Sequence, residues 1–255
     1  MKKLSISEIR YYLFEENPEA AWLDMMRRDE RKGVQQLISR YDRQKEEQKA
    51  RESAFLDSLF FENQYREEGF TAAAGVDEVG RGPLAGPVTA AAAILPENCF
   101  LPGLTDSKKL KKEERHYFYE KLQADSVYHI VHIPAEVIDD INIYQASREA
   151  MKQAVEGLQT KADILLVDAV TISTSLPQLP LTKGDERSAS IAAASVLAKV
   201  ERDRYMSELA RRYPEYGFDT NMGYGTAQHL AALDRIGPTP EHRRSFAPVR
   251  ESIQK

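Results

Sequence analysis

Two carboxylates occupy positions in this chain where apolar side chains are expected. Asp77 and Glu78 interrupt the small apolar run that begins at Ala72, inside a segment with the composition of a buried strand. An ionised carboxylate without a partner is costly to bury, so it either takes up a proton or binds a cation. Asp77 therefore indicates chemistry, because an acid in the middle of a strand has no turn to serve.

Two further acids lie where predicted elements end or begin. Asp168 follows the apolar run 164–167, and Asp185 follows Lys183 and Gly184 just before a long predicted helix. Each also has a structural interpretation, Asp168 as a turn residue at a strand end and Asp185 as a helix N-cap. The sequence leaves both interpretations open for these two positions.

The spacing of Asp77 and Glu78 sets a condition on a shared site. Successive side chains of a strand point to opposite faces, so both acids can serve one site only if the strand ends or bulges there. Gly80 and Gly82 follow closely and favour such a break.

Convergence of the four acids would require positive charge. Two like charges about 4 Å apart repel by roughly 4 kcal/mol at an effective dielectric of 20. Cys99 is the only cysteine in the sequence and no Cys/His cluster exists, so any metal would bind oxygen ligands. Mg²⁺ or Mn²⁺ suits such ligands, and substrate phosphate often completes their coordination. The pattern suggests metal-assisted phosphodiester hydrolysis.

The elements that must position these acids alternate between strands and helices from about residue 71 onward, which indicates an α/β fold. Strands are expected over 72–79, 87–95, 127–133 and 164–167. Helices are expected from an N-cap at 106–107 to about 123, from 134, and over 144–158, 188–212 and 226–234.

The first seventy residues differ in texture. Residues 1–70 have almost no strand-like sequence and are expected to form a helical extension, whereas 71–255 are expected to form a second domain, which contains the four acids. The segment 41–52 consists almost entirely of charged residues and Gln, which predicts a solvated helix, with disorder as the alternative. The 13 Lys and Arg against 15 Asp and Glu in the extension give no basic excess for nucleic-acid binding.

Composition limits the remaining function classes. The whole chain carries 35 Lys and Arg against 40 Asp and Glu, a net charge of −5, so adhesion to nucleic acid by bulk charge is disfavoured. No apolar run is long enough to span a membrane and no signal-type core follows the start, so we expect a cytoplasmic protein without a membrane partner.

Seven separated motifs resemble, in order, the bacterial ribonuclease HII family. The first is the segment 75–88, GVDEVGRGPLAGPV, and its Gly80-Arg81-Gly82 triplet points to type HII. The others are DSKKL at 106–110, VD at 167–168, KGD at 183–185, the small-residue helix 191–203, and GYGT at 223–226 with HRRSF at 242–246. Ala169 departs from the resemblance, because many relatives carry Gly there.

The resemblance implies a ribonuclease H-like fold, a mixed sheet flanked by helices, with a helical C-terminal region. It implies cleavage of the RNA strand of RNA/DNA hybrids and incision at ribonucleotides embedded in duplex DNA, leaving 5′-phosphate and 3′-hydroxyl ends. Two divalent cations, Mn²⁺ or Mg²⁺, would activate water and stabilise the leaving oxygen. Asp77, Glu78, Asp168 and Asp185 match the family's catalytic metal ligands.

The resemblance also assigns ribose recognition to Gly80, Arg81, Gly82 and Tyr224. Glycines let the backbone approach a sugar, and the 2′-hydroxyl distinguishes RNA from DNA. The structural alternative for the Gly80-Arg81-Gly82 triplet is a tight turn with a solvated arginine. For Tyr224 it is an anchor for the loop.

Lysines near these motifs are candidates for phosphate contacts. Lys108 and Lys109 fall in the expected first turn of a helix, where free amides favour anions. Lys183 and Lys199 are further candidates, with Arg243 and Arg244 more distant, and solvated surface roles are the alternative for all of them. Asp203 is expected to pair with Lys199.

Other side chains received structural interpretations. His116, His129, His132 and His229 have no ligand spacing and are expected to be structural or exposed. The alanines of the small-residue helix are expected to let it approach the sheet closely.

We expect the protein to be a monomer. Two other functions remain open from the residues alone. A deoxyribonuclease or resolvase would use a similar acidic site without reading the 2′-hydroxyl. An inactive hybrid-binding protein would bind without divalent-dependent turnover.

Overall fold

The computed structural model describes residues 4–16 and 18–254, and the chain divides into two compact units, Met1–Ala54 and Phe55–Lys255. Throughout these described ranges, no helix combines the length and the apolar character needed to cross a membrane.

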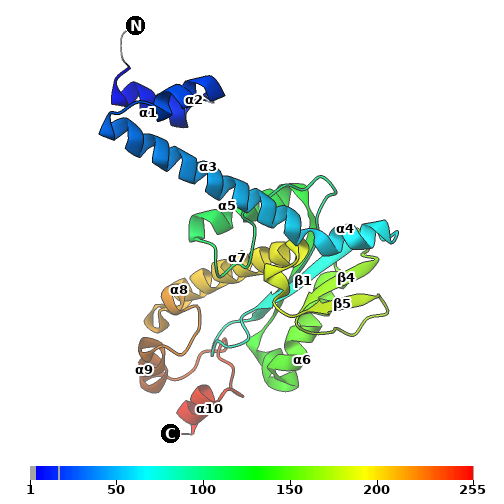
Figure 1. Ribbon diagram of the computed structural model, residues 1–255. Helices are drawn as coiled ribbons and strands as arrows, with labels where there is room; N and C mark the ends of the chain where they lie inside the picture. Colours follow the sequence, from blue (N-terminus) through cyan, green and yellow to red (C-terminus); the bar gives the residue numbers. More distant parts are fainter. Residues whose placement is uncertain (1–3, 17, 255) are drawn as a thin grey trace. The chain divides into compact units, whose positions relative to one another are not determined.

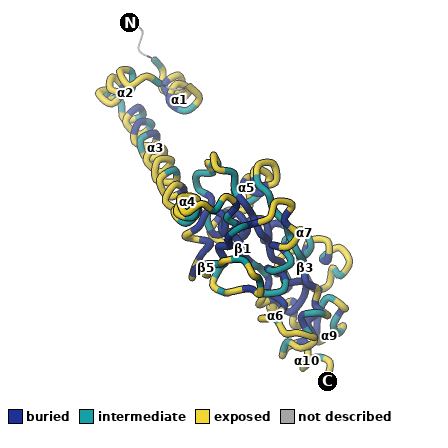
Figure 2. Tube along the Cα trace, turned by 90° about the vertical axis from the view of Figure 1, so that its right-hand side faces the viewer, coloured by how far each residue is buried: buried dark blue, intermediate teal, exposed yellow. Residues whose placement is uncertain are grey.

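The first unit consists of helices in its described residues. They are α1 (Ile6–Phe14), α2 (Ala20–Arg27) and the greater part of α3 (Lys32–Ser58). Their apolar faces form a small core of Ile9, Leu13, Met26, Val34, Ile38 and Tyr41. The charged segment 41–52 lies within α3 and is mostly exposed, so the predicted solvated helix is confirmed (Figure 2).

A five-stranded mixed sheet forms the centre of the second unit (Figure 1). Its strands lie in the order β3-β2-β1-β4-β5. The pairs β1/β2 and β2/β3 are antiparallel, whereas β1/β4 and β4/β5 are parallel. The strands are β1 (Ala73–Val79), β2 (Val88–Ile94), β3 (Val127–Ile133), β4 (Ile164–Asp168) and β5 (Gln178–Leu181). The predicted mixed sheet flanked by helices is confirmed.

Helices cover both faces of this sheet. On one face lie α7 (Ala189–Arg212) and α5 (Lys112–Asp125), and on the other lies α6 (Ala135–Glu156) (Figure 1). Side chains of β2 alternate between the two resulting cores: Ala90 and Ala92 face α6, and Ala91 and Ala93 face α7. This burial on both faces explains why β2 reads as a continuous apolar run.

The C-terminal region packs around the end of α7. It contains η2 (Pro214–Tyr216), α8 (Phe218–Asn221), α9 (Ala227–Ile236) and α10 (Ala247–Ile253). Its core includes Leu84 and Ala85, which belong to the loop after β1, together with Met206 and Phe218. The loop that follows the acidic strand is therefore anchored in the C-terminal helical region.

Several predicted element boundaries were wrong. Helix α5 begins at Lys112, so Asp106 is no helix N-cap; its carboxylate instead accepts a hydrogen bond from the Lys108 amide in a preceding turn. The two helices predicted from 134 and over 144–158, by contrast, are both present: α6 consists of two helical segments separated by a kink at Asn142, whose backbone is non-helical (φ 65°). Strand β5 was missed, because it is short and contains Pro180, which is tolerated at a sheet edge.

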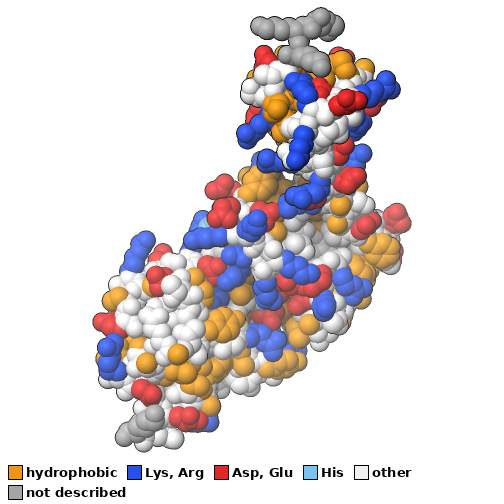
Figure 3. Space-filling view, turned by 60° about the vertical axis from the view of Figure 1, so that its left-hand side comes forward, with side chains coloured by type: hydrophobic (Ala, Val, Ile, Leu, Met, Phe, Trp, Pro, Cys, Tyr) orange, Lys and Arg blue, Asp and Glu red, His pale blue; other side chains and the backbone are white. Residues whose placement is uncertain are grey.

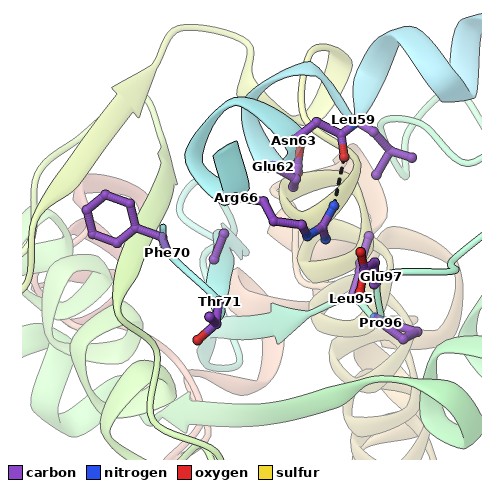
Figure 4. Close-up of a pocket in the computed structure, with 10 residues that line it drawn as sticks. Leu59, Glu62, Asn63, Arg66, Phe70, Thr71, Leu95, Pro96 and Glu97 are labelled. Carbon is purple, nitrogen blue, oxygen red and sulfur yellow. Dashed lines mark hydrogen bonds between the residues drawn. The ribbon is translucent and has the colours of Figure 1, made fainter. Parts of the chain in front are cut away.

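A short helix, α4 (Phe60–Glu67), belongs to the second unit and precedes β1. Its Glu62 is buried and accepts hydrogen bonds from Ser188 and Ser190 at the start of α7. A pocket opens beside α4, lined on one side by Asn63 and Arg66, which are joined by a 2.8 Å hydrogen bond, and on the other by residues 95–97 (Figure 4). None of the predicted site residues lines this pocket.

Candidate active site

Asp77 and Asp168 lie at the same edge of the sheet. Strands β1 and β4 are parallel and in register up to the pair Val76–Val167, and the two acids follow this pair directly. Carboxyl ends of parallel strands meet at one edge, where loops gather. Asp77 is buried and Asp168 half-buried, so the structure brings two predicted site residues together at the end of the apolar strands.

Strand β1 neither ends nor bulges at Asp77. Pairing with β2 continues in regular register through Asp77–Ala91, Glu78–Ala90 and Val79–Thr89. The predicted break at the glycines thus falls after the acids, and Glu78 points to the opposite face of the strand from Asp77. There the Arg81 guanidinium lies 3.4 Å from the Glu78 carboxylate.

Asp185 is not a helix N-cap. The N-cap of α7 is Ser188, whose hydroxyl accepts the Ile191 amide hydrogen, whereas Asp185 lies in a preceding turn, η1 (Gly184–Glu186). The Gly184 amide donates a 2.7 Å hydrogen bond to the Asp168 carboxylate, which ties this turn to the end of β4. The structure therefore brings Asp168 and Asp185 together.

The backbone conformation of Ala169 explains why glycine is favoured at this position. Ala169 adopts a left-handed conformation with φ 54°. Glycine occupies this region without the steric cost that a Cβ adds, so the position favours Gly for a backbone reason.

The acids perturb one another electrostatically. Burial raises the pKa of Asp77 well above its usual range, with further increases from the charges of Glu78 and Asp168. Burial raises the pKa of Glu78 to about 7, against the opposing effect of Arg81. The pKa of Asp185 rises to about 6, through burial and then through the nearby carboxylates of Asp106 and Asp168. Excess negative charge in partly desolvated surroundings is a feature of functional sites.

The donor set fits a hard divalent cation shared with substrate. Within residues 4–16 and 18–254, no three His, Cys, Asp or Glu side chains are grouped so that they could hold a metal ion by themselves. Mg²⁺ commonly takes one or two protein carboxylates and completes its shell with water and phosphate. The candidate ligands are Asp77, Glu78, Asp168 and Asp185, which offer oxygen donors only and repel one another without positive charge.

Three polar residues beside the acids were missed as site residues. The Ser195 hydroxyl on α7 hydrogen-bonds Asp77, and Ser107 Oγ lies 2.9 Å from Ser195 Oγ. Asp106 raises the pKa of Asp185 from the neighbouring turn. The available signal for Ser195 was a polar residue within a row of alanines on a buried helix.

The predicted lysines have different surroundings. Burial lowers the pKa of Lys108, but the carboxylates of Asp106 and Asp77 outweigh this effect and the pKa is raised overall. Lys108 therefore faces the acids. Lys109 is exposed and forms a 2.8 Å ion pair with Glu186. Neither lies in the first turn of a helix as predicted, since α5 begins only at Lys112.

Of the other two lysines, Lys183 precedes the small-residue helix α7 and Lys199 lies within it. Lys183 directly precedes Gly184, with a left-handed φ of 55°. Lys199 forms the expected pair with Asp203, at 2.6 Å between Nζ and Oδ1. In the view of Figure 3, basic side chains are interspersed with acidic ones rather than forming a continuous basic surface.

The glycine-rich loop and Tyr224 meet in space. A Cβ built on Gly82 would lie 3.3 Å from Cε1 of the Tyr224 ring, so the ring lies against this glycine. Tyr224 is 51% exposed, although its neighbours Gly223 and Gly225 contact the loop residues Ala85 and Leu84. The exposed Tyr224 ring beside the exposed backbone of Gly82 is suited to contact with a sugar.

Two buried arginines hold this loop by its carbonyl groups. Arg243 donates to the carbonyls of Gly80, Arg81 and Gly86, and Arg202 donates to Ala85, Pro87 and Met222. Burial and the charge of Arg202 lower the pKa of Arg243 to about 9. The interpretation of Arg243 as a phosphate contact was therefore wrong, because its guanidinium is buried and its donors serve the loop.

The mixed sheet with acids at the carboxyl ends of β1 and β4 defines a ribonuclease H-like protein. A family model described as Ribonuclease HII matches residues 74–249, and one described as Ribonuclease HII N-terminal domain matches residues 5–66. The curated Ribonuclease HII of Halalkalibacterium halodurans is 52% identical over 254 residues, 98% of this chain and 97% of that protein.

Solved structures show the same fold. The ribonuclease H2 of Pyrococcus horikoshii is 26% identical with a TM-score of 0.63, covering 72% of this chain and 98% of that one. Bst-RNase HIII in complex with Mn²⁺ is 19% identical with a TM-score of 0.57, covering 72% of this chain and 69% of that one. The chain belongs to the ribonuclease HII family, whose enzymes cleave the RNA of RNA/DNA hybrids.

Proposed function

We propose that this enzyme incises duplex DNA at embedded ribonucleotides as well as cleaving the RNA strand of longer hybrids, with two divalent cations. The observation that carries the proposal is the group of buried and half-buried, mutually repelling carboxylates at the carboxyl ends of β1 and β4, beside a loop that presents glycines and an aromatic ring.

The four acids would hold the cations. Asp77 and Asp168 contribute oxygens from one edge of the sheet, and Asp185 contributes from the turn tied to Asp168. Glu78 points to the other face of β1, so it would have to reach the ions around the end of the strand, which lies one residue further on at Val79. Two such ions supply activation of the attacking water and stabilisation of the leaving oxygen. This chemistry leaves 5′-phosphate and 3′-hydroxyl ends. The Mn²⁺ present in the related Bst-RNase HIII structure supports divalent-ion use.

The loop and the ring would recognise the ribose. Gly82 is exposed and would let the backbone approach the 2′-hydroxyl, which both donates and accepts hydrogen bonds, whereas Gly80 is buried against Arg202 and would contribute by shaping the loop. The ring of Tyr224 would pack on the sugar, and Arg81 would contact the substrate beside Glu78. Phosphate contacts would come from Lys108 next to the acids, and from the more peripheral lysines at 109, 183 and 199.

Residues 71–255 would carry the catalysis and 1–70 would form an extension to it. The enzyme would act as a cytoplasmic monomer on nucleic acid alone.

A matched pair of duplexes tests the proposal. One duplex carries a single ribonucleotide and its twin is entirely DNA, and each is incubated with Mg²⁺ or Mn²⁺, with and without chelator. We expect cutting of the first duplex only, at the ribonucleotide and only with free cation. Equal cutting of both would instead indicate a deoxyribonuclease, and binding without cation-dependent cutting would indicate a hybrid-binding protein.

A further inference from the structure

Two buried histidines adjoin the candidate ribose reader without belonging to the acidic site. His229, in the first turn of α9, and His242, in the C-terminal loop, are both fully buried. Their Nε2 atoms lie 2.9 Å apart, and the rings of Tyr216 and Phe218 pack around both imidazoles. The spacing of His229 in the sequence predicts only a structural or exposed role.

The hydrogen bonds around this pair fix where every proton must lie. His242 Nδ1 accepts the backbone N–H of Thr239 at 3.0 Å, so this nitrogen carries a lone pair and the proton of neutral His242 lies on Nε2. That proton is donated to His229 Nε2, which must therefore accept. His229 then carries its own proton on Nδ1, which lies 2.9 Å from the carbonyl oxygen of Tyr224.

Each hydrogen bond in this series permits only one direction of donation. The Thr239 amide can only donate and the Tyr224 carbonyl can only accept, so the two ends dictate the tautomers of both histidines between them. A second proton on either ring would set two N–H groups against each other. Burial lowers the pKa of both histidines, which agrees with a pair that is neutral in the folded protein.

This series of hydrogen bonds ends at the Tyr224 carbonyl, and the backbone of Tyr224 is held by further hydrogen bonds on both sides. The Tyr224 carbonyl also accepts the Thr226 amide, and the Tyr224 amide donates to the Asn221 carbonyl. The backbone of Tyr224 is thus fixed while its ring stays exposed against Gly82.

We propose that His229 and His242 are positioning residues for ribose recognition: they form a proton-ordered relay from Thr239 to the Tyr224 carbonyl that fixes the backbone presenting the Tyr224 ring. This inference rests on the proposed function for the role of the ring, but the relay itself can be tested separately.

The tautomers provide the first test, without any substitution. In nitrogen NMR spectra of full-length protein labelled with ¹⁵N-histidine at pH 7, we expect His229 as the neutral Nδ1–H tautomer and His242 as the neutral Nε2–H tautomer. His229 found as the Nε2–H tautomer, or either ring found protonated, would overturn the relay whatever the substrate preference of the enzyme.

A pair of near-isosteric variants tests the positioning role. In His229→Asn the amide nitrogen can replace Nδ1 as the donor to Tyr224, whereas in His229→Gln the amide lies nearer the position of Nε2. The readout is the ratio of dissociation constants, measured in chelator, for the all-DNA duplex and its twin with one ribonucleotide. We expect His229→Gln to reduce this preference about tenfold, as loss of one hydrogen bond would, and His229→Asn to retain it.

Two controls separate the possible failures. His116→Gln on α5 controls for removal of a histidine elsewhere. In the Tyr224→Ala background, His229→Gln should cause no further loss of preference, because a residue that acts through the ring has no effect once the ring is gone. Equal preference in wild type and His229→Gln would overturn the positioning role, whereas absence of any ribose preference in the wild type would contradict the proposed function instead.

Discussion

The α carbon of Gly75 lies directly against the backbone of Ser190. A Cβ built on Gly75 would be 2.0 Å from the Ser190 carbonyl carbon and 2.2 Å from its oxygen. The first turn of α7 thus rests on β1 just before Asp77 and just after the turn that carries Asp185. The missing side chain of Gly75 therefore sets the separation between the acid on the strand and the acid before the helix.

We expect Gly75→Ala to be among the most damaging single substitutions in the chain. The added methyl group would push against backbone rather than a movable side chain, so α7 must shift away from β1. The expected cost is about 3 kcal/mol of unfolding free energy, the upper range for overpacking, with loss of most cleavage activity. Denaturant unfolding and a hybrid cleavage assay measure the two effects. Wild-type stability would show that the helix can move freely at this point.

Asp77→Asn should separate catalysis from stability. The carboxylate is buried and its pKa is raised by desolvation and by neighbouring acids, so a neutral amide relieves an unfavourable charge in the metal-free protein. We expect cleavage to be abolished in Mg²⁺ or Mn²⁺, while thermal unfolding in chelator shows stability unchanged or higher by about 1 kcal/mol.

Asp219→Asn is the matched control for this substitution, because Asp219 is exposed on α8. It should leave cleavage and unfolding temperature as in the wild type. Near-normal cleavage by Asp77→Asn would exclude Asp77 as a ligand of the cations.

The acidic site could be predicted because its residues contradict their surroundings. Asp77 and Asp168 follow apolar runs, and the cost of burying a charge turns that contrast into a prediction about chemistry. The sheet and its main helices followed from the same runs, because burial on both faces leaves a continuous apolar segment.

The supports of the site left no comparable signal. Arg243 reads as a surface arginine in a polar loop, since its acceptors are backbone carbonyls about 160 residues earlier in the chain. Carbonyl groups carry no side-chain identity, so neither composition nor spacing records that they need a donor. The proton order of His229 and His242 likewise depends on which backbone atoms they meet, and only the tertiary structure provides that.

Tyr224→Ala should weaken discrimination more than binding. The ring is half exposed and lies against Gly82, so its removal leaves the loop in place but takes away the surface that would pack on the sugar. We expect the preference for the duplex with one ribonucleotide over its all-DNA twin to fall about tenfold. The affinity for the all-DNA duplex should change less than about threefold. Tyr224→Phe should retain most of the preference, and an unchanged preference in the alanine variant would remove the ring from ribose recognition.

The buried histidine pair should make the free energy of unfolding decrease as the pH falls. Burial lowers the pKa of His242 from 6.5 to about 4, and repulsion between the two rings when both are protonated acts in the same direction. The unfolded chain therefore binds a proton as the pH falls below 6.5, while folded His242 remains neutral until the pH nears 4. The contribution is full above the unfolded pKa and is lost as the pH falls, by on the order of 3 kcal/mol in total.

The acids act in the opposite direction, so the comparison must isolate the histidine. Raised pKa values in the folded state, as at Glu78 and Asp185, favour folding as the pH falls. We therefore expect the unfolding free energy of the wild type to decline more steeply between pH 6.5 and 4.5 than that of His242→Asn, which keeps an acceptor for Thr239. Parallel pH profiles for the two proteins would mean that His242 titrates normally in the folded state.

The position of the start of α7 should depend on Glu62, a buried carboxylate on α4. Glu62 Oε1 accepts from both the amide and the hydroxyl of Ser190, at 2.9 and 2.6 Å, and from the Ser188 hydroxyl at 2.6 Å. Glu62→Ala leaves these buried donors without their acceptor, with an expected loss of about 2 to 3 kcal/mol. Glu67→Ala, exposed on the same helix, is the matched control and should be neutral.

Truncation extends the same test to the boundary of the catalytic unit. A chain that starts at Phe55 keeps Glu62 and the buried Phe55 side chain, whereas a chain that starts at Thr71 loses both. We expect the longer chain to unfold at nearly the wild-type denaturant concentration and to cleave hybrids. The shorter chain should be destabilised at least as much as Glu62→Ala, because it also loses the packing of Phe55. Equal stability of the two truncated chains would show that the start of α7 holds its position without α4.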